Sequence, residues 1–343
     1  MRLNATRPKV IVSSPVEPAS LAGLAPYAEI VINEALEPWS RAELIDRAAD
    51  AFAWVAFMSD AVDGDLLRAC PSLRIIAGAL KGYDNFDVDA CSRHGVWLTV
   101  VPDLLTAPTA DLTLGLLLAL SRNLLEGDRS VRRGTYRGWR PLLYGSGLEG
   151  ASVGFLGMGA LGQAVARRLA GFGCRLTYFD EKPLPEEAER SLRLTAADLV
   201  QIASESDVVI LALPLTSHTV RIVDRPFLAS LKPGCLLINP ARGSLVDEEA
   251  VADAIDGGRL AGYAADVFAL EDIGAGKSTH CGIPARLLSD TKRTVLTPHL
   301  GSAVRDVRRR IVAEAAANIV DCIEGRRPRG AVNTVAARAE GYP

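Results

Sequence analysis

The residues best suited to chemistry begin with a glycine-rich turn, Gly157, Gly159 and Gly162 in the run GMGALG. The turn directly follows an apolar run at 153–156 and precedes a helical pattern over 160–169, so it lies between a predicted strand and a predicted helix. There the first glycine permits a tight turn, the second lets a pyrophosphate approach the backbone, and the third lets the helix pack on the strand. The N–H groups at the helix start would hold the phosphates. The turn therefore predicts a dinucleotide site.

An acidic residue follows the next predicted strand, 175–179, at Asp180. An acid about 20 residues beyond the glycines binds the ribose hydroxyl of NAD. Asp180 and Glu181 together would repel the additional phosphate of NADP, so NAD is the expected cofactor. Lys182 leaves the degree of this preference open.

A proton-transfer group is expected at His299, the only one of four histidines that follows a predicted strand. Histidine exchanges a proton near neutral pH, and a carboxylate such as Glu271 would hold its tautomer. Arg242 follows the strand 236–239 and can bind an anionic substrate through two parallel hydrogen bonds. His299 with Glu271 is therefore the candidate proton-transfer pair, and Arg242 is the candidate anion-binding residue.

Other residues at the carboxyl ends of the predicted strands complete the expected site, because ligands of open α/β sheets bind at that edge. Besides the three glycines, Asp180, Arg242 and His299, the expected cofactor contacts in this part of the chain are Ala212, Leu213, Pro214, Pro240, Ala241, Asp266, Gly301 and Ser302. Strand ends nearer the N-terminus offer Met58, Lys81 and Gly82. No spacing of cysteine and histidine suggests a metal site.

The elements that must position these residues form two alternating series of strands and helices. The first series has predicted strands at 10–13, 29–32, 52–57, 73–79 and 96–100, and the second at 152–156, 175–179, 208–213, 236–239, 261–265 and 295–296. Strands that alternate with helices form a parallel sheet covered on both faces. The fold class is therefore α/β, with two doubly wound parallel-sheet domains, the second having the six strands of a complete dinucleotide-binding sheet.

The division between the domains is expected after Pro102, where the alternation stops and a long apolar helix, 107–120, begins. The terminal helix, 303–324, ends in a tail rich in Gly, Pro and Arg that would return to the first domain. The substrate domain would then consist of residues 1–103 and 304–343, and the cofactor domain, residues 104–303, would be inserted between these two segments of the chain.

Composition excludes several other functions. The 343 residues carry a net charge of −3, which lacks the basic excess of a nucleic-acid-binding protein. Six scattered cysteines suggest no disulfide framework, and a reducing cytoplasm fits. The N-terminus has no apolar signal region, and the longest apolar run, 112–120, is too short to span a bilayer, so no membrane partner is expected.

The motifs LALPL, NPARGSLVDE, GYAADVF and TPHLGSA, together with the glycine turn, resemble the D-2-hydroxyacid dehydrogenase superfamily across essentially the whole chain. The resemblance implies a Rossmann NAD domain, a flavodoxin-like substrate domain and a homodimer paired through the cofactor domain. It also implies that Arg242, Glu271 and His299 are the catalytic set. Further cofactor contacts implied by it are Thr109, Ala160, Leu161 and Lys81. An insertion at 272–290 departs from the family pattern and leaves the packing beside Glu271 open.

Within that family, the stretches ALKGYDNFDVDAC, GWRPLLYG and GSAVRDVR most resemble its phosphite-oxidising members. This finer likeness implies that Lys81, Gly82 and Arg308 bind substrate with Arg242. It also implies that the pocket is shaped by Met58, Trp139 and Tyr144. Because three cations suit a doubly charged anion, phosphite is the expected substrate, with water attacking phosphorus as hydride passes to NAD.

Two alternatives remain open from the sequence. One is a D-2-hydroxyacid dehydrogenase or glyoxylate/hydroxypyruvate reductase of the same fold. The other is a non-enzymatic NAD-sensing regulator. Retention of the complete set Arg242, Glu271 and His299 argues against the regulator.

Overall fold

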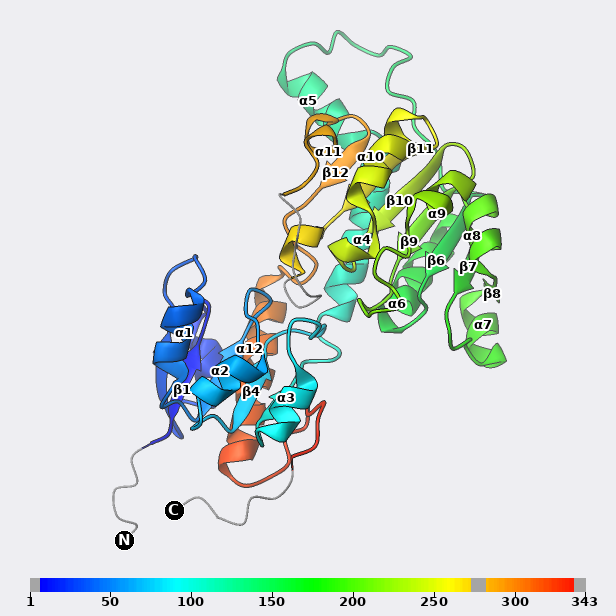
Figure 1. Cartoon of the computed structure of the whole chain (residues 1–343). Helices are drawn as coiled ribbons and strands as arrows, with labels where there is room; N and C mark the ends of the chain where they lie inside the picture. Colours follow the sequence, from blue (N-terminus) through cyan, green and yellow to red (C-terminus); the bar gives the residue numbers. More distant parts are fainter. Residues whose placement is uncertain (1–6, 273–281, 336–343) are drawn as a thin grey trace. The chain divides into compact units, whose positions relative to one another are not determined.

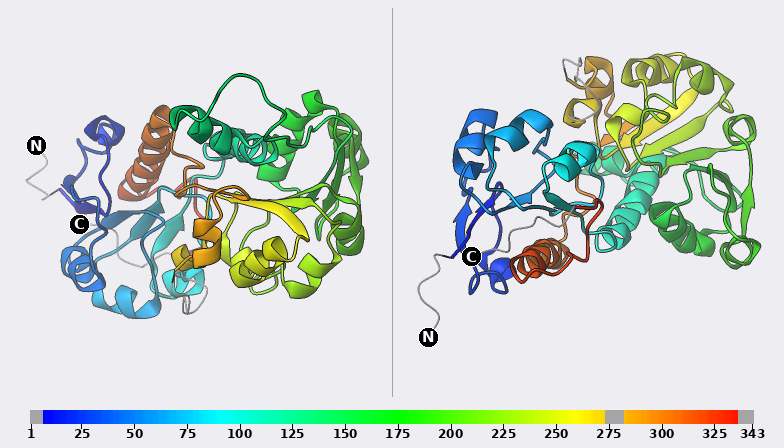
Figure 2. Two further views of the ribbon diagram at one scale, coloured as in Figure 1. Left: turned by 90° about the horizontal axis from the view of Figure 1, so that it is seen from above. Right: turned by 60° about the horizontal axis from the view of Figure 1, so that its bottom comes forward.

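The computed structural model describes residues 7–272 and 282–335 and separates into two compact units. The first unit is Met1–Leu105 with Ala303–Pro343, and the second is Thr106–Ser302. Each unit has a parallel sheet with helices on both faces, as Figures 1 and 2 show. The expected α/β class with two parallel-sheet domains is confirmed.

The first unit has a five-stranded sheet in the order β2-β1-β3-β4-β5, which is the flavodoxin order. Its strands are β1 Lys9–Val12, β2 Glu29–Ile32, β3 Ala53–Ala56, β4 Ile75–Gly78 and β5 Trp97–Thr99. Its helices are α1 Arg41–Ala48, α2 Gly64–Ala69, α3 Val88–Arg93 and α12 Arg305–Ile323, with a short helix η1 at Pro18–Leu21. Every residue of β3 and β4 is buried, which explains why these segments are continuous apolar runs rather than alternating ones.

The C-terminal tail is hydrogen-bonded to the edge strand of this unit. The N–H of Val100 donates to the carbonyl of Gly330 over 3.0 Å. Asn333 is buried, and its side chain accepts from the N–H of Leu98 and donates to the carbonyl of Val96, each over 2.9 Å. The tail therefore covers backbone groups beside β5 that would otherwise form an exposed sheet edge.

The second unit has a seven-stranded sheet in the order β12-β11-β10-β9-β6-β7-β8. Its strands are β6 Ser152–Leu156, β7 Arg175–Phe179, β8 Leu194–Ala196, β9 Val208–Leu211, β10 Cys235–Asn239, β11 Leu260–Ala265 and β12 Thr294–Leu296. The first six strands in chain order have the Rossmann arrangement 3-2-1-4-5-6, and β12 extends it. Strand β8 was not predicted, because two of its three residues are exposed and it therefore lacks an apolar run.

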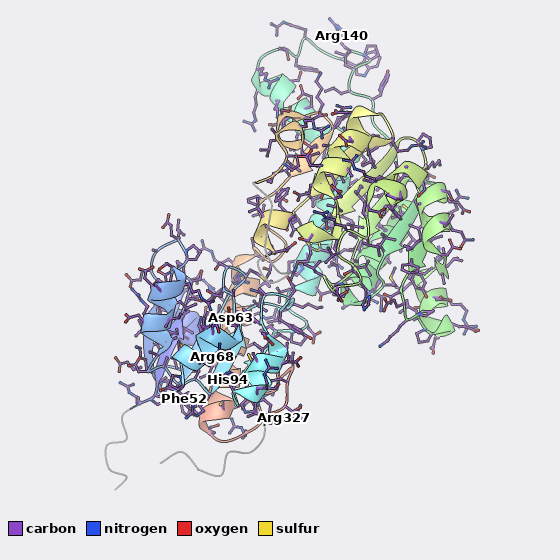
Figure 3. The ribbon with its side chains drawn as sticks, in the orientation of Figure 1. Phe52, Asp63, Arg68, His94, Arg140 and Arg327 are labelled. Atoms are coloured by element: carbon purple, nitrogen blue, oxygen red, sulfur yellow. The ribbon has the colours of Figure 1, made fainter. Side chains whose placement is uncertain are left out.

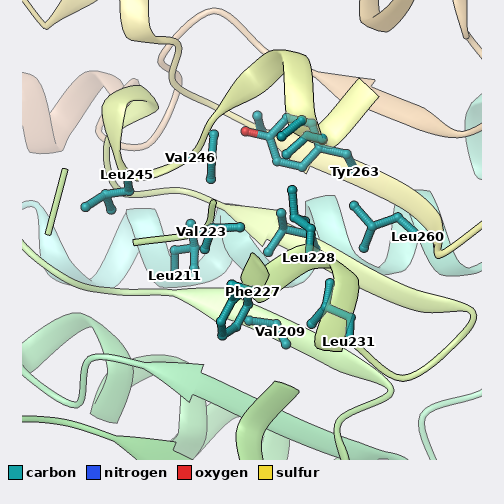
Figure 4. Packing of buried hydrophobic residues seen from close by; sticks show 14 of the residues in the cluster. Val209, Leu211, Val223, Phe227, Leu228, Leu231, Leu245, Val246, Leu260 and Tyr263 are labelled. Carbon is teal, nitrogen blue, oxygen red and sulfur yellow. The ribbon is translucent and has the colours of Figure 1, made fainter. Parts of the chain in front are cut away.

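Helices cover both faces of this second sheet. The helices of this unit are α4 Thr106–Ser121, α5 Leu124–Arg132, α6 Ala160–Leu169, α7 Glu186–Leu192, α8 Leu199–Glu205, α9 Arg225–Ser230, α10 Glu248–Asp256 and α11 Ala285–Ser289, with short helices η2 Ala170–Phe172, η3 Gly243–Leu245 and η4 Ala269–Glu271. Figure 4 shows the core on the α9 and α10 side, where Val209 and Leu211 of β9 pack near Phe227 and Leu228 of α9. Each fully buried side chain of this kind contributes about 1.5–3 kcal/mol.

The apolar helix α4 packs on the opposite face, against α6, β10 and β11. Its apolar composition is explained in part by the burial of Leu116, Leu117 and Leu120. Within residues 7–272 and 282–335, no helix is both long and apolar enough to cross a membrane.

An exposed segment, residues 131–147, begins in the last turn of α5 and continues beyond it, and we call it the arm. Every residue of the arm is exposed, whereas Leu148 directly after it is buried. Figure 3 labels Arg140 within this extended stretch. Six large apolar side chains on the arm are exposed: Val131, Tyr136, Trp139, Leu142, Leu143 and Tyr144.

Candidate active site

The glycine turn connects β6 to α6, and its geometry excludes larger residues at two positions. Gly157 has a φ of 94°, and a Cβ there would lie 2.6 Å from the carbonyl oxygen of Ala212. A Cβ on Gly162 would lie 2.6 Å from the carbonyl oxygen of Gly157. Gly159 faces open space and precedes the first residue of α6 without a side-chain cap among the described residues. The start of α6 thus offers backbone N–H groups to a phosphate.

Asp180 directly follows β7, at the side of this turn. One of its carboxylate oxygens accepts the N–H of Met158 over 2.8 Å, and the other accepts the N–H of Lys182 over 2.9 Å. These bonds fix the carboxylate beside the glycine turn, where a ribose would lie. A cavity of about 350 Å³ adjoins it, lined by Tyr178, Phe179, Asp180, Pro183, Ala196, Ala197, Asp198 and Gln201.

His299 and Glu271, the two residues expected to form a proton-transfer pair, are in contact in the second unit. The Nδ1 atom of His299 lies 2.7 Å from Oε2 of Glu271. The other oxygen of Glu271 accepts the N–H of Phe268 over 2.9 Å, which fixes the carboxylate. Because Nδ1 faces the carboxylate, Nε2 is the ring atom available for proton exchange with a substrate.

His299 is held in an unusual backbone conformation by Asp266. The φ of His299 is 54°, in the left-handed region that few residues other than glycine adopt. Asp266 is buried, and its carboxylate accepts the N–H groups of Leu300 and Gly301 over 2.7 and 2.8 Å and the hydroxyl of Thr297 over 2.6 Å. These bonds surround His299 on both sides along the chain and stabilise the loop that presents it.

Arg242 lies beyond the end of β10, in a turn held by the fully buried Asn239. The Asn239 side chain accepts the N–H of Ala241 over 3.1 Å and donates to the carbonyl of Arg242 over 2.8 Å. The next residue, Gly243, packs so tightly that a Cβ would lie 1.9 Å from the carbonyl carbon of Phe268. The Arg242 turn and the segment that leads to Glu271 are therefore in direct contact. Asn239 was given no role in the sequence analysis.

The residues expected from the N-terminal domain lie at the carboxyl edge of the first unit. Met58 follows β3, and Lys81 and Gly82 follow β4. Burial lowers the pKa of Lys81, and the carboxylate of Asp103 opposes that change. The guanidinium of Arg308 donates to the carbonyl of Ala79 over 3.4 Å and lies over the Phe57 ring at 5.8 Å. Burial lowers its pKa also.

A buried acid that the sequence analysis missed, Asp60, organises the same edge. Its carboxylate accepts the hydroxyl of Ser13, at the end of β1, and the N–H of Phe57 over 2.7 Å. The side chain of Asn85 donates to the carbonyls of Met58 and Asp60. The loop that carries Met58 is thus tied to two neighbouring segments. The only sequence signal for Asp60 is its place shortly after an apolar strand.

Replacing Asp60 with asparagine is expected to remove a loss of stability that the native chain undergoes as the pH rises. The difference in the free energy of unfolding, variant minus native, should therefore increase with pH. Burial raises the pKa of Asp60 to about 6 from the usual 3.8. The folded state therefore holds this proton more tightly than the unfolded state, and stability falls as pH rises between these values. Between about pH 4 and pH 7 the variant should gain about 2–3 kcal/mol over the native chain.

Urea unfolding at a series of pH values measures this difference. The exposed Asp89, replaced in the same way, is the matched control and should show no such trend. Parallel stability curves for the Asp60 variant and the native chain would exclude the proposed cost of ionising Asp60.

Trp139 and Tyr144, expected to shape a pocket, lie on the arm and are 77% and 76% exposed. They therefore line no enclosed pocket formed by the residues that the structure describes. Of the insertion 272–290, residues 273–281 lie outside the described residues, whereas Asp272 is buried and accepts the N–H of Ser244 over 2.7 Å. Among the described residues, no group of three or more His, Cys, Asp or Glu could hold a metal ion.

The fold and this site define a nicotinamide-dinucleotide-dependent oxidoreductase built from two Rossmann-type units. Residues 114–301 match the family model of the D-isomer specific 2-hydroxyacid dehydrogenase, NAD binding domain. The chain belongs to the D-isomer-specific 2-hydroxyacid dehydrogenase family.

Relatives of known name match nearly the whole chain. The glyoxylate reductase of Thermococcus gammatolerans is 35% identical over 95% of this chain and 96% of its own length. The glyoxylate reductase of Korarchaeum cryptofilum is 34% identical over 98% of this chain and 99% of its own length. Among solved structures, a protein from Thermus thermophilus has a TM-score of 0.85 at 35% identity, over 94% of this chain and 99% of its own. An NADPH-dependent glyoxylate/hydroxypyruvate reductase from Sinorhizobium meliloti, bound to NADP and malonate, has a TM-score of 0.83 at 30% identity, over 98% and 100%.

These relatives overturn phosphite as the substrate. The expectation depended on counting Lys81, Arg242 and Arg308 as three cations that hold one anion. Arg308 already has partners within the first unit, a carbonyl and an aromatic ring. The number of basic residues in the sequence therefore does not measure the charge of the ligand, and the finer likeness to phosphite-oxidising members gave a wrong substrate.

Proposed function

We propose that this protein is an NAD-dependent reductase of small 2-oxo acids such as glyoxylate and hydroxypyruvate, working reversibly on the corresponding 2-hydroxy acids. The observation that carries the proposal is the pair His299 and Glu271, 2.7 Å apart in the unit that also carries the glycine turn. The names of relatives that match 95% or more of the chain support the substrate class.

Each residue of the site has a role in this reaction. The reduced cofactor, when bound, supplies a hydride to the C2 carbonyl carbon of the substrate. Nε2 of protonated His299 would donate its proton to the carbonyl oxygen, which becomes the hydroxyl. Glu271 would hold the other ring nitrogen and stabilise the positive charge on the imidazole. Arg242 would bind the substrate carboxylate and orient the carbonyl.

Oxidation of NADH measured with glyoxylate, hydroxypyruvate and longer 2-oxo acids tests the proposal directly. We expect turnover with the small acids, accompanied by formation of the 2-hydroxy acid. Binding of NADH without turnover of any 2-oxo acid would contradict it.

Replacing Asp180 with alanine is expected to weaken the preference for NADH over NADPH. The carboxylate is fixed beside the glycine turn by two backbone N–H groups, where it would repel a ribose phosphate. Its removal should change the ratio of kcat/KM for the two cofactors by about 10- to 100-fold, or roughly 1.4–2.8 kcal/mol. The S. meliloti relative is NADPH-dependent, so the preference must be measured for each chain.

Initial rates with both cofactors at a fixed concentration of glyoxylate measure this ratio. Replacement of the neighbouring Glu181 with glutamine is the matched control and should have a smaller effect. An unchanged cofactor ratio in the Asp180 variant would remove the ribose role from this residue.

We also propose that the chain forms a homodimer. The six exposed apolar side chains of the arm favour this, since an apolar surface left exposed on one chain commonly marks an interface with another protein. A molar mass of one chain in solution, measured by light scattering, would contradict the dimer.

A further inference from the structure

Glu248 is the first residue of α10, and its side chain points away from solvent. The residue is 4% exposed. Its Oε1 atom accepts the N–H of Ala269 over 2.9 Å. Ala269 is the first residue of η4, and Glu271 is the last. A single hydrogen bond therefore joins this buried carboxyl to the turn from which Glu271 projects.

Two further contacts hold the same turn. Gly243 packs against Phe268 and Ala269 so closely that no side chain could be added. The carboxylate of Asp272 accepts the N–H of Ser244. Among these contacts, Glu248 is the one that ties η4 to α10, so the position of Glu271 depends on a residue in a regular helix.

The surroundings of Glu248 are acidic. The carboxylates of Glu271 and Asp272 face it from the turn, Glu249 is next to it on α10, and the buried hydroxyl of Tyr263 approaches from β11. Burial, together with these carboxylates, raises the pKa of Glu248 to about 7. Glu248 therefore gains its negative charge in the pH range where histidine exchanges protons.

We propose that Glu248 is a positioning residue for Glu271 and His299, and that its ionisation sets the upper pH limit of proton donation by His299. The proposal rests on the proposed function. An ionised Glu248 adds a second negative charge behind Glu271, which stabilises the protonated imidazole. Proton donation to a 2-oxo acid then continues to higher pH than it would beside a neutral side chain.

Replacement of Glu248 with glutamine tests the electrostatic part, because the amide keeps an oxygen for the N–H of Ala269 but cannot ionise. The pH at which kcat/KM for glyoxylate reduction falls to half should decrease by roughly 0.5–1 pH unit. Asp256→Asn is the matched control, since that side chain is exposed, lies at the other end of α10 and pairs with Arg286. We expect its profile to follow that of the native enzyme.

A second readout does not require a substrate. The His299 ring can be followed by NMR through a pH titration, with its signal assigned from a His299→Gln sample. Its titration midpoint should be lower in Glu248→Gln than in the native chain and unchanged in Asp256→Asn. If no 2-oxo acid is reduced but this midpoint moves, the proposed function fails and the role of Glu248 stands.

Replacement of Glu248 with alanine tests the positioning part, because it removes the acceptor of the Ala269 N–H. The kcat should decrease about tenfold while the Kd of NADH is retained, because only the proton-transfer pair is displaced. Should this variant fail to fold, the glutamine variant still decides the question. A pH profile and a His299 midpoint in Glu248→Gln that both match the native chain would overturn the proposal.

Discussion

Replacing His299 with glutamine is expected to lower kcat for glyoxylate reduction by about 10²- to 10⁴-fold, the usual contribution of a positioned acid or base. Glutamine can still hydrogen-bond to Glu271 but cannot donate a proton at neutral pH. The glycine turn after β6 and Asp180 after β7 are untouched, so the Kd of NADH should change by less than about twofold.

Stopped-flow reduction and NADH fluorescence titration measure these two quantities. His218, which is exposed in a loop of the same unit, provides the matched control, and its glutamine variant should retain full activity. The kcat of Glu271→Gln should lie between those of the His299 and His218 variants, because glutamine keeps a partner for Nδ1 of His299 but loses the negative charge. A His299 variant with native kcat would remove this residue from the catalytic set and with it the main support for the proposed function.

Replacing Arg242 with alanine is expected to lower kcat/KM for glyoxylate by about 10²- to 10³-fold, equivalent to roughly 2.7–4 kcal/mol. The guanidinium can hold a carboxylate by two parallel hydrogen bonds, and the buried Asn239 fixes the backbone from which it projects. Lysine at the same position keeps the charge but not the paired donors, so it should restore only part of the lost rate.

The control for this experiment is Arg225→Ala, which removes an exposed ion pair with Asp253 elsewhere in the second unit. Its kcat/KM should stay within about twofold of the native value, since exposed ion pairs contribute little. If Arg242→Ala raised only the KM of NADH and not that of glyoxylate, Arg242 would be a cofactor contact rather than the substrate anchor.

Much of the fold was predictable because its signals are local. Strands β3 and β4 are buried on both faces, so each appears as a short continuous apolar run. The helix α6 was predicted with the correct bounds from the glycines before it and its amphipathic pattern. The short, mostly exposed β8 has no such signal, because its place in the sheet depends on backbone pairing with β7.

The site was predictable to a smaller extent. The pairing of His299 with Glu271 was expected, and these two residues are 28 positions apart in the chain. The phosphite substrate was wrong, because the sequence lists basic residues without showing what each one contacts. Arg308 illustrates the problem, since its guanidinium lies against an aromatic ring and a carbonyl of its own unit.

The sequence by itself determined the glycine turn, the acid after β7 and the two parallel sheets. The reason is that glycine geometry and apolar periodicity act between residues close together in the chain. Only the tertiary structure decided that Asp60 and Glu248 are buried acids. Asp60 bonds to a residue 47 positions away and Glu248 to one 21 positions away. Burial and charge depend on such distant neighbours, so the properties of these two carboxyls exist only in the folded chain.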